Sequence, residues 1–132
     1  MRPLRLLLVE DSENDATLLL EHLRQGGYDP KYTRVDSARD LSDALDREWD
    51  LVIADYTMPG FSGTSALSIV RDRGLEVPFI FVSGTIGEEI AVEAMKNGAD
   101  DYIIKNNLNR LIPAINRELR DAEVRRARSR AE

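Results

Sequence analysis

Five short apolar runs alternate with five longer stretches of helical spacing along this chain, and this alternation constrains the fold more than any other feature. The apolar runs lie at residues 4–9, 31–35, 51–54, 79–82 and 102–104. Helical stretches of about 10–15 residues between short strands are typical of parallel βαβ units. The alternation therefore predicts an α/β domain in which the strands form one parallel sheet.

The composition of each run indicates where its strand lies in the sheet. Residues 51–54 are continuously apolar, as expected of a central strand that is buried on both faces. Residues 31–35 are partly polar, which favours a position at the sheet edge. With right-handed crossovers, we predict a flavodoxin-like, doubly wound sheet of five parallel strands in the order 2-1-3-4-5, with five helices.

Capping residues and glycines predict where the helices begin and end. The first helix is expected to follow Ser12, with Asp15 three positions on resembling a short capping box, and to end at Gly26. Its predicted buried face consists of Ala16, Leu19, Leu20 and Leu23. The remaining helices are expected to begin at Ser37 or Asp36, at Ser62 or Thr64, at Gly87 and at Leu108.

The chain has 132 residues, enough for one domain with its own core, and it carries a net charge of −6 with no cysteine. The absence of cysteine excludes a disulfide framework and a thiolate metal site, and it fits a cytoplasmic location. The negative charge argues against a general nucleic-acid-binding surface. No apolar run approaches the length of a membrane span, about 18 residues, so we expect no membrane partner.

Polar side chains follow four of the predicted strands: Glu10 and Asp11, then Asp55, Ser83 and Lys105. The carboxyl ends of parallel strands share one edge of the sheet, and the switch point between strands 1 and 3 brings three carboxylates together. Three carboxylates within a few ångströms repel one another unless a cation is present. Mg²⁺ binds one or two carboxylates and keeps several waters, so these acids form a candidate Mg²⁺ site.

A carboxylate in such a site has the chemistry of a phosphoryl acceptor. Asp55 is a candidate nucleophile that forms an acyl phosphate, while Lys105 offers a positive charge and Ser83 a hydroxyl donor to the phosphoryl group. Each residue alone has an ordinary explanation, such as a charge at a helix N-terminus, a turn, or an exposed loop lysine. Their occurrence together at four strand ends favours a shared site.

The sequence resembles the receiver domain of two-component response regulators over residues 4–118. The resemblance is carried by the acidic pair Glu10-Asp11, the run DYTMPG that begins at Asp55, the run VSGT that contains Ser83, and the run DDYIIK that ends at Lys105. It implies a regulatory domain rather than an enzyme. It also implies that Asp55 accepts phosphate from a histidine kinase or a phosphotransfer protein.

The resemblance assigns roles to the residues around the acceptor. The implied Mg²⁺ ligands are Glu10, Asp11, Asp55 and the Thr57 backbone carbonyl. Ser83 and Lys105 are implied to contact the phosphoryl group. Tyr102 stands where the family has its switch aromatic. Ser83 and Tyr102 are therefore expected to move on phosphorylation and to reshape the surface of helix 4, strand 5 and helix 5.

The chain departs from the family pattern at two positions. Glu10 stands where aspartate is commoner, and Asn106 follows Lys105 where the family usually has a proline after a cis bond. A cis bond before a residue other than proline costs about 2.5–4 kcal/mol, so we expect a trans bond, which puts the reach of Lys105 in question. Two alternatives remain: a pseudo-receiver that binds partners without phosphorylation, and a haloacid-dehalogenase-type phosphatase, which has a second aspartate where this chain has Thr57.

The last helix changes character near its C-terminal end. Residues 117–132 contain six arginines and four acids, and beyond Leu119 the apolar positions thin to mostly small residues. We therefore predict a receiver domain at residues 1–118 and a helical extension at residues 119–132 that connects to an output domain outside this sequence. The extension is expected either to pair with a second copy as a short coiled coil or to remain a solvated helix end.

Overall fold

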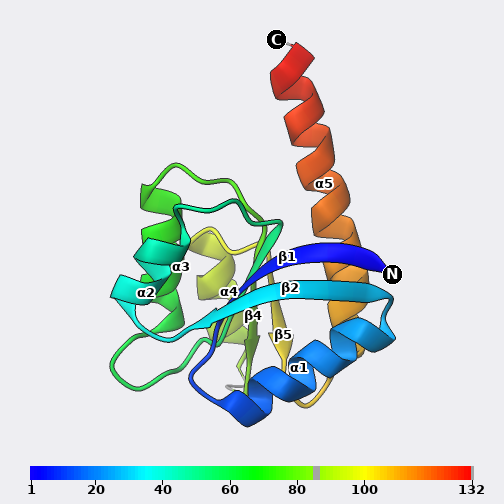
Figure 1. Cartoon of the computed structure of the whole chain (residues 1–132). Coiled ribbons are helices and arrows are strands. Elements are labelled where there is room, and N and C mark those ends of the chain that lie inside the picture. The colour runs from blue at the N-terminus through cyan, green and yellow to red at the C-terminus, as the bar shows by residue number, and fades with distance from the viewer. Residues whose placement is uncertain (85–86, 132) are drawn as a thin grey trace.

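The computed structural model describes residues 1–84 and 87–131, and in these residues five parallel strands form one sheet in the order β2-β1-β3-β4-β5 (Figure 1). The strands are β1 (Arg2–Val9), β2 (Tyr28–Val35), β3 (Leu51–Ala54), β4 (Phe79–Ser83) and β5 (Asp101–Ile104). The predicted order is confirmed, and β2 lies at the sheet edge as its polar composition indicated. Both β1 and β2 begin earlier than the apolar runs suggested.

In the described part of the chain, five α-helices connect and cover the strands, and a short 3₁₀ turn precedes the last helix. They are α1 (Glu13–Gln25), α2 (Ala38–Ala44), α3 (Gly63–Asp72), α4 (Glu88–Lys96) and α5 (Leu111–Ala131), with the turn η1 at Leu108–Arg110. Helices α1 and α5 cover one face of the sheet, and α2, α3 and α4 cover the other (Figure 1).

Successive residues of the central strands point into two separate cores. Leu6 and Leu8 of β1 join a cluster with α1 and α5, whereas Leu7 and Val9 join a cluster with α2, α3 and α4. All residues of β3 and β4 are buried. Side chains alternate between the faces of a strand, so two packed layers of helices hold the central strands from both sides. The polar strand ends are thereby placed on a rigid edge.

Serine side chains cap three of the helices. Ser12, Ser37 and Ser62 each accept a hydrogen bond from the backbone N–H three residues further on. Such a bond satisfies one of the N–H groups that have no partner at a helix start. The structure therefore selects Ser37 and Ser62 from the predicted alternatives. The predicted buried face of α1 is confirmed in full: Ala16, Leu19, Leu20 and Leu23.

The last helix differs from the prediction at its start. Residues 108–110 form the 3₁₀ turn, and α5 begins at Leu111 rather than at Leu108. Pro113 lies in the first turn of α5, where backbone N–H groups have no partner within the helix, so a proline is tolerated there. The apolar face of α5 packs on the sheet through Leu111, Ile115 and Leu119.

Helix α5 continues past the body of the domain as far as Ala131 (Figure 1). Its side chains are buried at positions up to Ala122, and residues 123–131 are exposed. Arg2 of β1 pairs with Glu123 at 2.9 Å, so the first turn beyond Ala122 still contacts the body. A helical extension is thus present, while the domain boundary at residue 118 stays a prediction. None of the described helices is long and apolar enough to cross a membrane.

Candidate functional site

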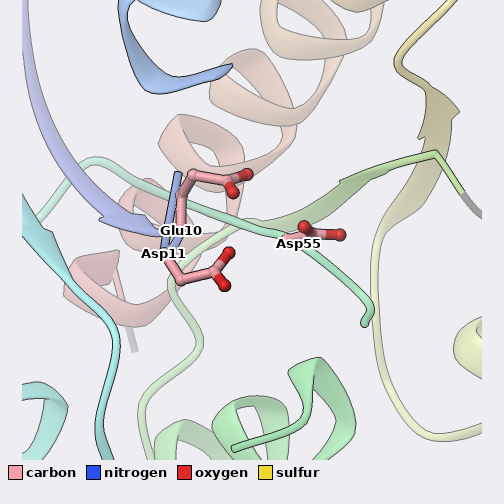
Figure 2. A group of neighbouring side chains, drawn as sticks. All are labelled: Glu10, Asp11 and Asp55. Atoms are coloured by element: carbon pink, nitrogen blue, oxygen red, sulfur yellow. The ribbon is translucent and has the colours of Figure 1, made fainter. Parts of the chain in front are cut away.

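The carboxyl ends of β1 and β3 lie side by side, because Val9 is the register partner of Ala54. Glu10 and Asp11 follow β1, and their side chains extend toward Asp55, which follows β3 (Figure 2). One carboxylate oxygen from each of the three acids lies within 4.8 Å of the others. The expected acidic cluster is therefore present at the switch point of the sheet.

Backbone hydrogen bonds fix the two acids that come directly after the strands. The Asp55 N–H donates to the Val9 carbonyl oxygen at 2.9 Å, and the Glu10 N–H donates to the Val35 carbonyl oxygen at 3.0 Å. These bonds continue the ladder of the sheet by one residue on each strand. Both side chains therefore leave the backbone at the edge itself, with little freedom in their Cα positions.

The two acids are also buried. Glu10 is 3% exposed and Asp55 is 8% exposed. The Ser12 N–H donates to the Glu10 carboxylate at 3.1 Å, and the Thr57 N–H donates to Asp55 Oδ1 at 3.3 Å. Burial raises the pKa of Glu10, and the hydrogen bonds from Lys105 and Ser12 offset only part of this effect. A carboxylate in this state gains from any cation that approaches it.

Lys105 supplies positive charge to the cluster from the end of β5. Its backbone N–H donates to the Ser83 carbonyl oxygen at 2.8 Å, which fixes the start of its side chain. Its Nζ atom lies 2.7 Å from Asp15 Oδ2 and 3.1 Å from both Glu10 Oε2 and Asp55 Oδ2. Burial lowers the pKa of Lys105, but the hydrogen bonds to Asp15, Glu10 and Asp55 outweigh it and raise the pKa above its ordinary value. The group is therefore a stable ammonium.

The residue after Lys105 does not prevent this contact. The Lys105–Asn106 peptide bond is trans, as predicted. Lys105 Nζ nevertheless reaches Asp55, so the absence of a proline after Lys105 does not shorten the reach of its side chain.

The donor set of the cluster suits a hard divalent cation. Glu10, Asp11 and Asp55 offer carboxylate oxygens, the ligand type that Mg²⁺ prefers, and no nitrogen or sulfur ligand is among them. Asp11 is exposed, which leaves a path for a hydrated ion. The side chains present therefore fit Mg²⁺. The Thr57 backbone carbonyl stays a predicted ligand.

The ring of Tyr56, next to Asp55, contacts Tyr102, which forms the predicted switch pair with Ser83. Ser83 is fully buried at the end of β4, and its side chain hydrogen-bonds to Tyr102, which is 6% exposed. Burial raises the pKa of the Tyr102 hydroxyl, while the bond to Ser83 lowers it. Tyr56, the residue after Asp55, makes edge contacts with Phe81 and Tyr102, with ring centroids 5.2 and 5.7 Å apart. Tyr102 is thus in an inward position, and its outward position stays a prediction.

The structure brings together the acids and the lysine that the sequence singled out, and it adds Asp15. The sequence pattern around Asp15 indicates only a helix cap. Its backbone N–H does take part in the cap, but its carboxylate makes the shortest contact to Lys105. The available signal was its position in the first turn of a helix that begins directly after the β1 strand end.

This arrangement is that of a receiver, the regulatory module of two-component signalling. The chain belongs to the response regulator receiver domain family, whose sequence model matches residues 6–116.

Curated relatives and solved structures agree with the assignment. The chain is 37% identical over 102 residues to the response regulator protein FleR of Pseudomonas aeruginosa, covering 76% of this chain and 21% of FleR. It is 37% identical over 102 residues to the transcriptional regulatory protein RprY of Bacteroides fragilis, covering 77% of this chain and 43% of RprY. The chain thus spans less than half the length of these relatives.

One solved structure with similar architecture contains ligands. The receiver domain of the histidine kinase CKI1 from Arabidopsis thaliana, complexed with Mg²⁺ and BeF₃⁻, is 25% identical to this chain with a TM-score of 0.70. The match covers 89% of this chain and 90% of that structure.

Proposed function

We propose that Asp55 accepts a phosphoryl group from a histidine kinase or a phosphotransfer protein in two-component signalling. The observation that carries this proposal is the 3.1 Å contact between Lys105 Nζ and Asp55 Oδ2 beside the carboxylates of Glu10 and Asp11. Phosphoryl transfer depends mainly on positioning and on neutralising the charge of the phosphoryl group. The site pairs a candidate nucleophile with an ammonium and with the acids for a cation.

Glu10, Asp11 and Asp55 are the residues that would hold Mg²⁺, together with the Thr57 backbone carbonyl. When bound, Mg²⁺ neutralises charge on the acceptor and on the incoming phosphoryl group. The all-oxygen donor set supports this assignment. The CKI1 receiver, which was solved as a complex with Mg²⁺ and BeF₃⁻, supports it by family likeness.

In the proposed transfer, an Asp55 carboxylate oxygen attacks the phosphorus of a phosphohistidine. The O–P bond forms as the N–P bond breaks, and the imidazole nitrogen that leaves takes up a proton from solvent. Lys105 then contacts one phosphoryl oxygen through its ammonium, and the Ser83 hydroxyl donates a hydrogen bond to another. The product is an acyl phosphate on Asp55.

We assign the switch that follows phosphorylation to Ser83 and Tyr102. A phosphoryl group adds acceptor oxygens to the site, so the Ser83 hydroxyl gains a partner on the Asp55 side. Tyr102 already lies inward without a phosphoryl group. We therefore propose that phosphorylation, as Ser83 turns toward its new partner, shifts an existing equilibrium further toward this inward position. The surface affected is that of α4, β5 and α5.

The experiment that tests the proposal is labelling with a small phosphodonor. Acetyl phosphate with Mg²⁺ should add a hydroxylamine-sensitive phosphoryl group to the wild type and to the control Asp40→Asn, but not to Asp55→Asn, as measured by intact mass. Full labelling of Asp55→Asn would refute Asp55 as the acceptor. No labelling of any variant would favour a pseudo-receiver, and continuous hydrolysis of the donor without a stable adduct would favour a phosphatase.

We further propose that the extension of α5 connects this domain to an output domain. The relatives FleR and RprY are more than twice as long as the region that matches this chain, which supports such an arrangement. We place the domain in the cytoplasm, where histidine kinases phosphorylate their partners. The extension either pairs with a second copy or acts as a single connecting helix.

A further inference from the structure

We propose that Asp15 is a positioning residue that keeps the Lys105 ammonium beside Asp55 once a cation has engaged Glu10 and Asp55. This inference rests on the proposed function, because it assigns a role in the same site. Asp15 itself contacts neither Asp55 nor the incoming phosphoryl group in the proposed transfer. It acts through Lys105.

The geometry of the pair favours Asp15 over the other two carboxylates. Asp15 Oδ2 lies 2.7 Å from Lys105 Nζ, which is shorter than the 3.1 Å contacts to Glu10 and Asp55. The backbones on both sides of the contact are fixed. The Asp15 N–H donates to Ser12 Oγ at 3.2 Å, and the Lys105 N–H donates to the Ser83 carbonyl oxygen at 2.8 Å.

The number of hydrogen-bond donors on Lys105 explains why Asp15 matters. An ammonium has three N–H donors, and Glu10, Asp15 and Asp55 account for three acceptors. Two of these acceptors belong to the acidic cluster that fits a divalent cation, and Asp15 does not. A bound cation competes with Lys105 for Glu10 and Asp55. Asp15 is then the carboxylate that stays available to Lys105.

The surroundings of the pair strengthen its interaction. Asp15 and Lys105 line a cavity of about 90 Å³ whose other walls are mostly apolar: Leu8, Leu18, Leu19, Ile53, Val82 and Leu108. The side chain of Lys105 is 23% exposed and that of Asp15 is 43% exposed. An ion pair beside an apolar wall is screened less by water than one on an open surface. The apolar wall therefore strengthens the attraction between the Asp15 carboxylate and the Lys105 ammonium.

The alternative role for Asp15 is that of an ordinary acid in the first turn of α1, where a negative charge stabilises the helix. Glu13 provides a matched control for that role. It lies in the same turn, is largely exposed, and pairs with Arg34 at 3.3 Å rather than with Lys105. Glu13→Gln removes the same charge from the same helix end without touching the pair.

The first experiment measures the rate of labelling by acetyl phosphate at saturating Mg²⁺. We expect Asp15→Asn to be about tenfold slower than the wild type, which corresponds to about 1.4 kcal/mol, and Glu13→Gln to react at the wild-type rate. In a Lys105→Met background, Asp15→Asn should cause no further loss, because its effect passes through Lys105. A wild-type rate for Asp15→Asn, an equal loss in Glu13→Gln, or an additive loss in the Lys105→Met background would each overturn the proposal.

The second experiment needs no phosphodonor, so it separates this inference from the proposed function. The hydrogen exchange of the Lys105 ammonium with water is measured by NMR in Mg²⁺-saturated protein. We expect faster exchange in Asp15→Asn than in the wild type and unchanged exchange in Glu13→Gln. If acetyl phosphate never labelled the wild type, the proposed function would be wrong. This measurement would still test the contact between Asp15 and Lys105. Equal exchange in the wild type and Asp15→Asn would overturn the assignment.

Discussion

The two ends of the sheet use charge in opposite ways. At the carboxyl edge, the single ammonium of Lys105 contacts three carboxylates, and Asp11 lies close to two of them. At the amino edge, the acids just before β3 and β5 each contact an arginine. Asp50, just before β3, pairs with Arg5 at 2.8 Å, and Asp100, just before β5, pairs with Arg71 at 3.3 Å.

This difference separates an edge whose charges are paired within the fold from the edge that carries the candidate site. A carboxylate with a fixed cationic partner has its charge satisfied within the domain, so it stabilises the fold and attracts little else. A surplus of carboxylates around one ammonium leaves negative charge for an external cation to neutralise. The comparison predicts that removing charge at the amino edge destabilises the fold, and that removing an acid at the carboxyl edge does not.

The largest loss of folding stability is expected for a substitution of Arg71. Its guanidinium donates to the carbonyl oxygens of Leu75, Val77 and Gly98 and to Asp100, and thereby joins the end of α3 to the turn before β5. Arg71→Met should lower the free energy of unfolding by about 3 kcal/mol, because it leaves these acceptors without their donor. Urea unfolding measures the change.

Arg73 is the matched control for this prediction. It also lies at the end of α3, and its contact is a single pair with the exposed Asp46 at 3.1 Å. We expect Arg73→Met to change the stability by less than about 0.5 kcal/mol. Equal losses for the two variants would contradict the view that the Arg71 contacts are structural.

A smaller effect is expected at Asp50, and it should depend on pH. Burial alone would raise the pKa of Asp50, but the hydrogen bonds and charge of Arg5 outweigh it and lower the pKa below the ordinary value of 3.8. A carboxylate with a lowered pKa in the folded state stabilises the protein above its unfolded pKa. This stabilisation is lost as the pH falls through 3.8 toward the folded pKa.

Asp50→Asn should therefore cost about 1 kcal/mol at pH 7, a modest figure because solvent screens the half-exposed Arg5. The difference between variant and wild type should shrink as the pH is lowered below about 5, since the wild-type carboxylate then becomes protonated. Urea unfolding between pH 3 and pH 7 checks this. A difference that does not vary with pH would show that the Asp50 charge is not the cause.

The smallest change in the free energy of unfolding is expected for a substitution of Glu10, and it should be an increase rather than a loss. Burial raises the pKa of Glu10, so the ionised form is less favourable in the folded state than in the unfolded one. Glu10→Gln should raise the free energy of unfolding by about 0.5 kcal/mol at pH 7 without Mg²⁺, since the amide still accepts the Ser12 hydrogen bond. With Mg²⁺ the order should reverse, because the wild type binds the ion more tightly. A loss of stability without Mg²⁺ would remove the contrast between the edges.

The sequence predicted the features that depend on local pattern. The order of the strands followed from alternation and the crossover rule, and the carboxyl edge followed from polar residues directly after apolar runs. The amino-edge pairs could not be predicted this way. Arg5 and Asp50 are 45 residues apart, and Arg71 and Asp100 are 29 apart, so no spacing marks them as partners.

Asp15 was missed for a related reason. Its position after Ser12 explained it fully as part of a helix cap, and its contact with Lys105 joins the start of α1 to the residue after β5, 90 positions further along the chain. The inward position of Tyr102 likewise depends on packing with Tyr56, just after β3, and with Phe81 of β4. Both residues are distant from Tyr102 in the sequence. Local pattern identifies which residues carry chemistry, while tertiary packing decides which of them touch.

The unbroken course of α5 has a consequence for any segment that follows it. An α-helix advances about 1.5 Å and turns about 100° with each residue, so the 21 residues of α5 span about 32 Å. The buried residues up to Ala122 fix the rotation of this helix about its own axis. Inserting one residue after Ala122 would turn a following domain by about 100°, whereas inserting four would leave it within about 40° of its original azimuth. The length of the exposed extension, counted in residues, therefore sets the direction in which an attached domain faces.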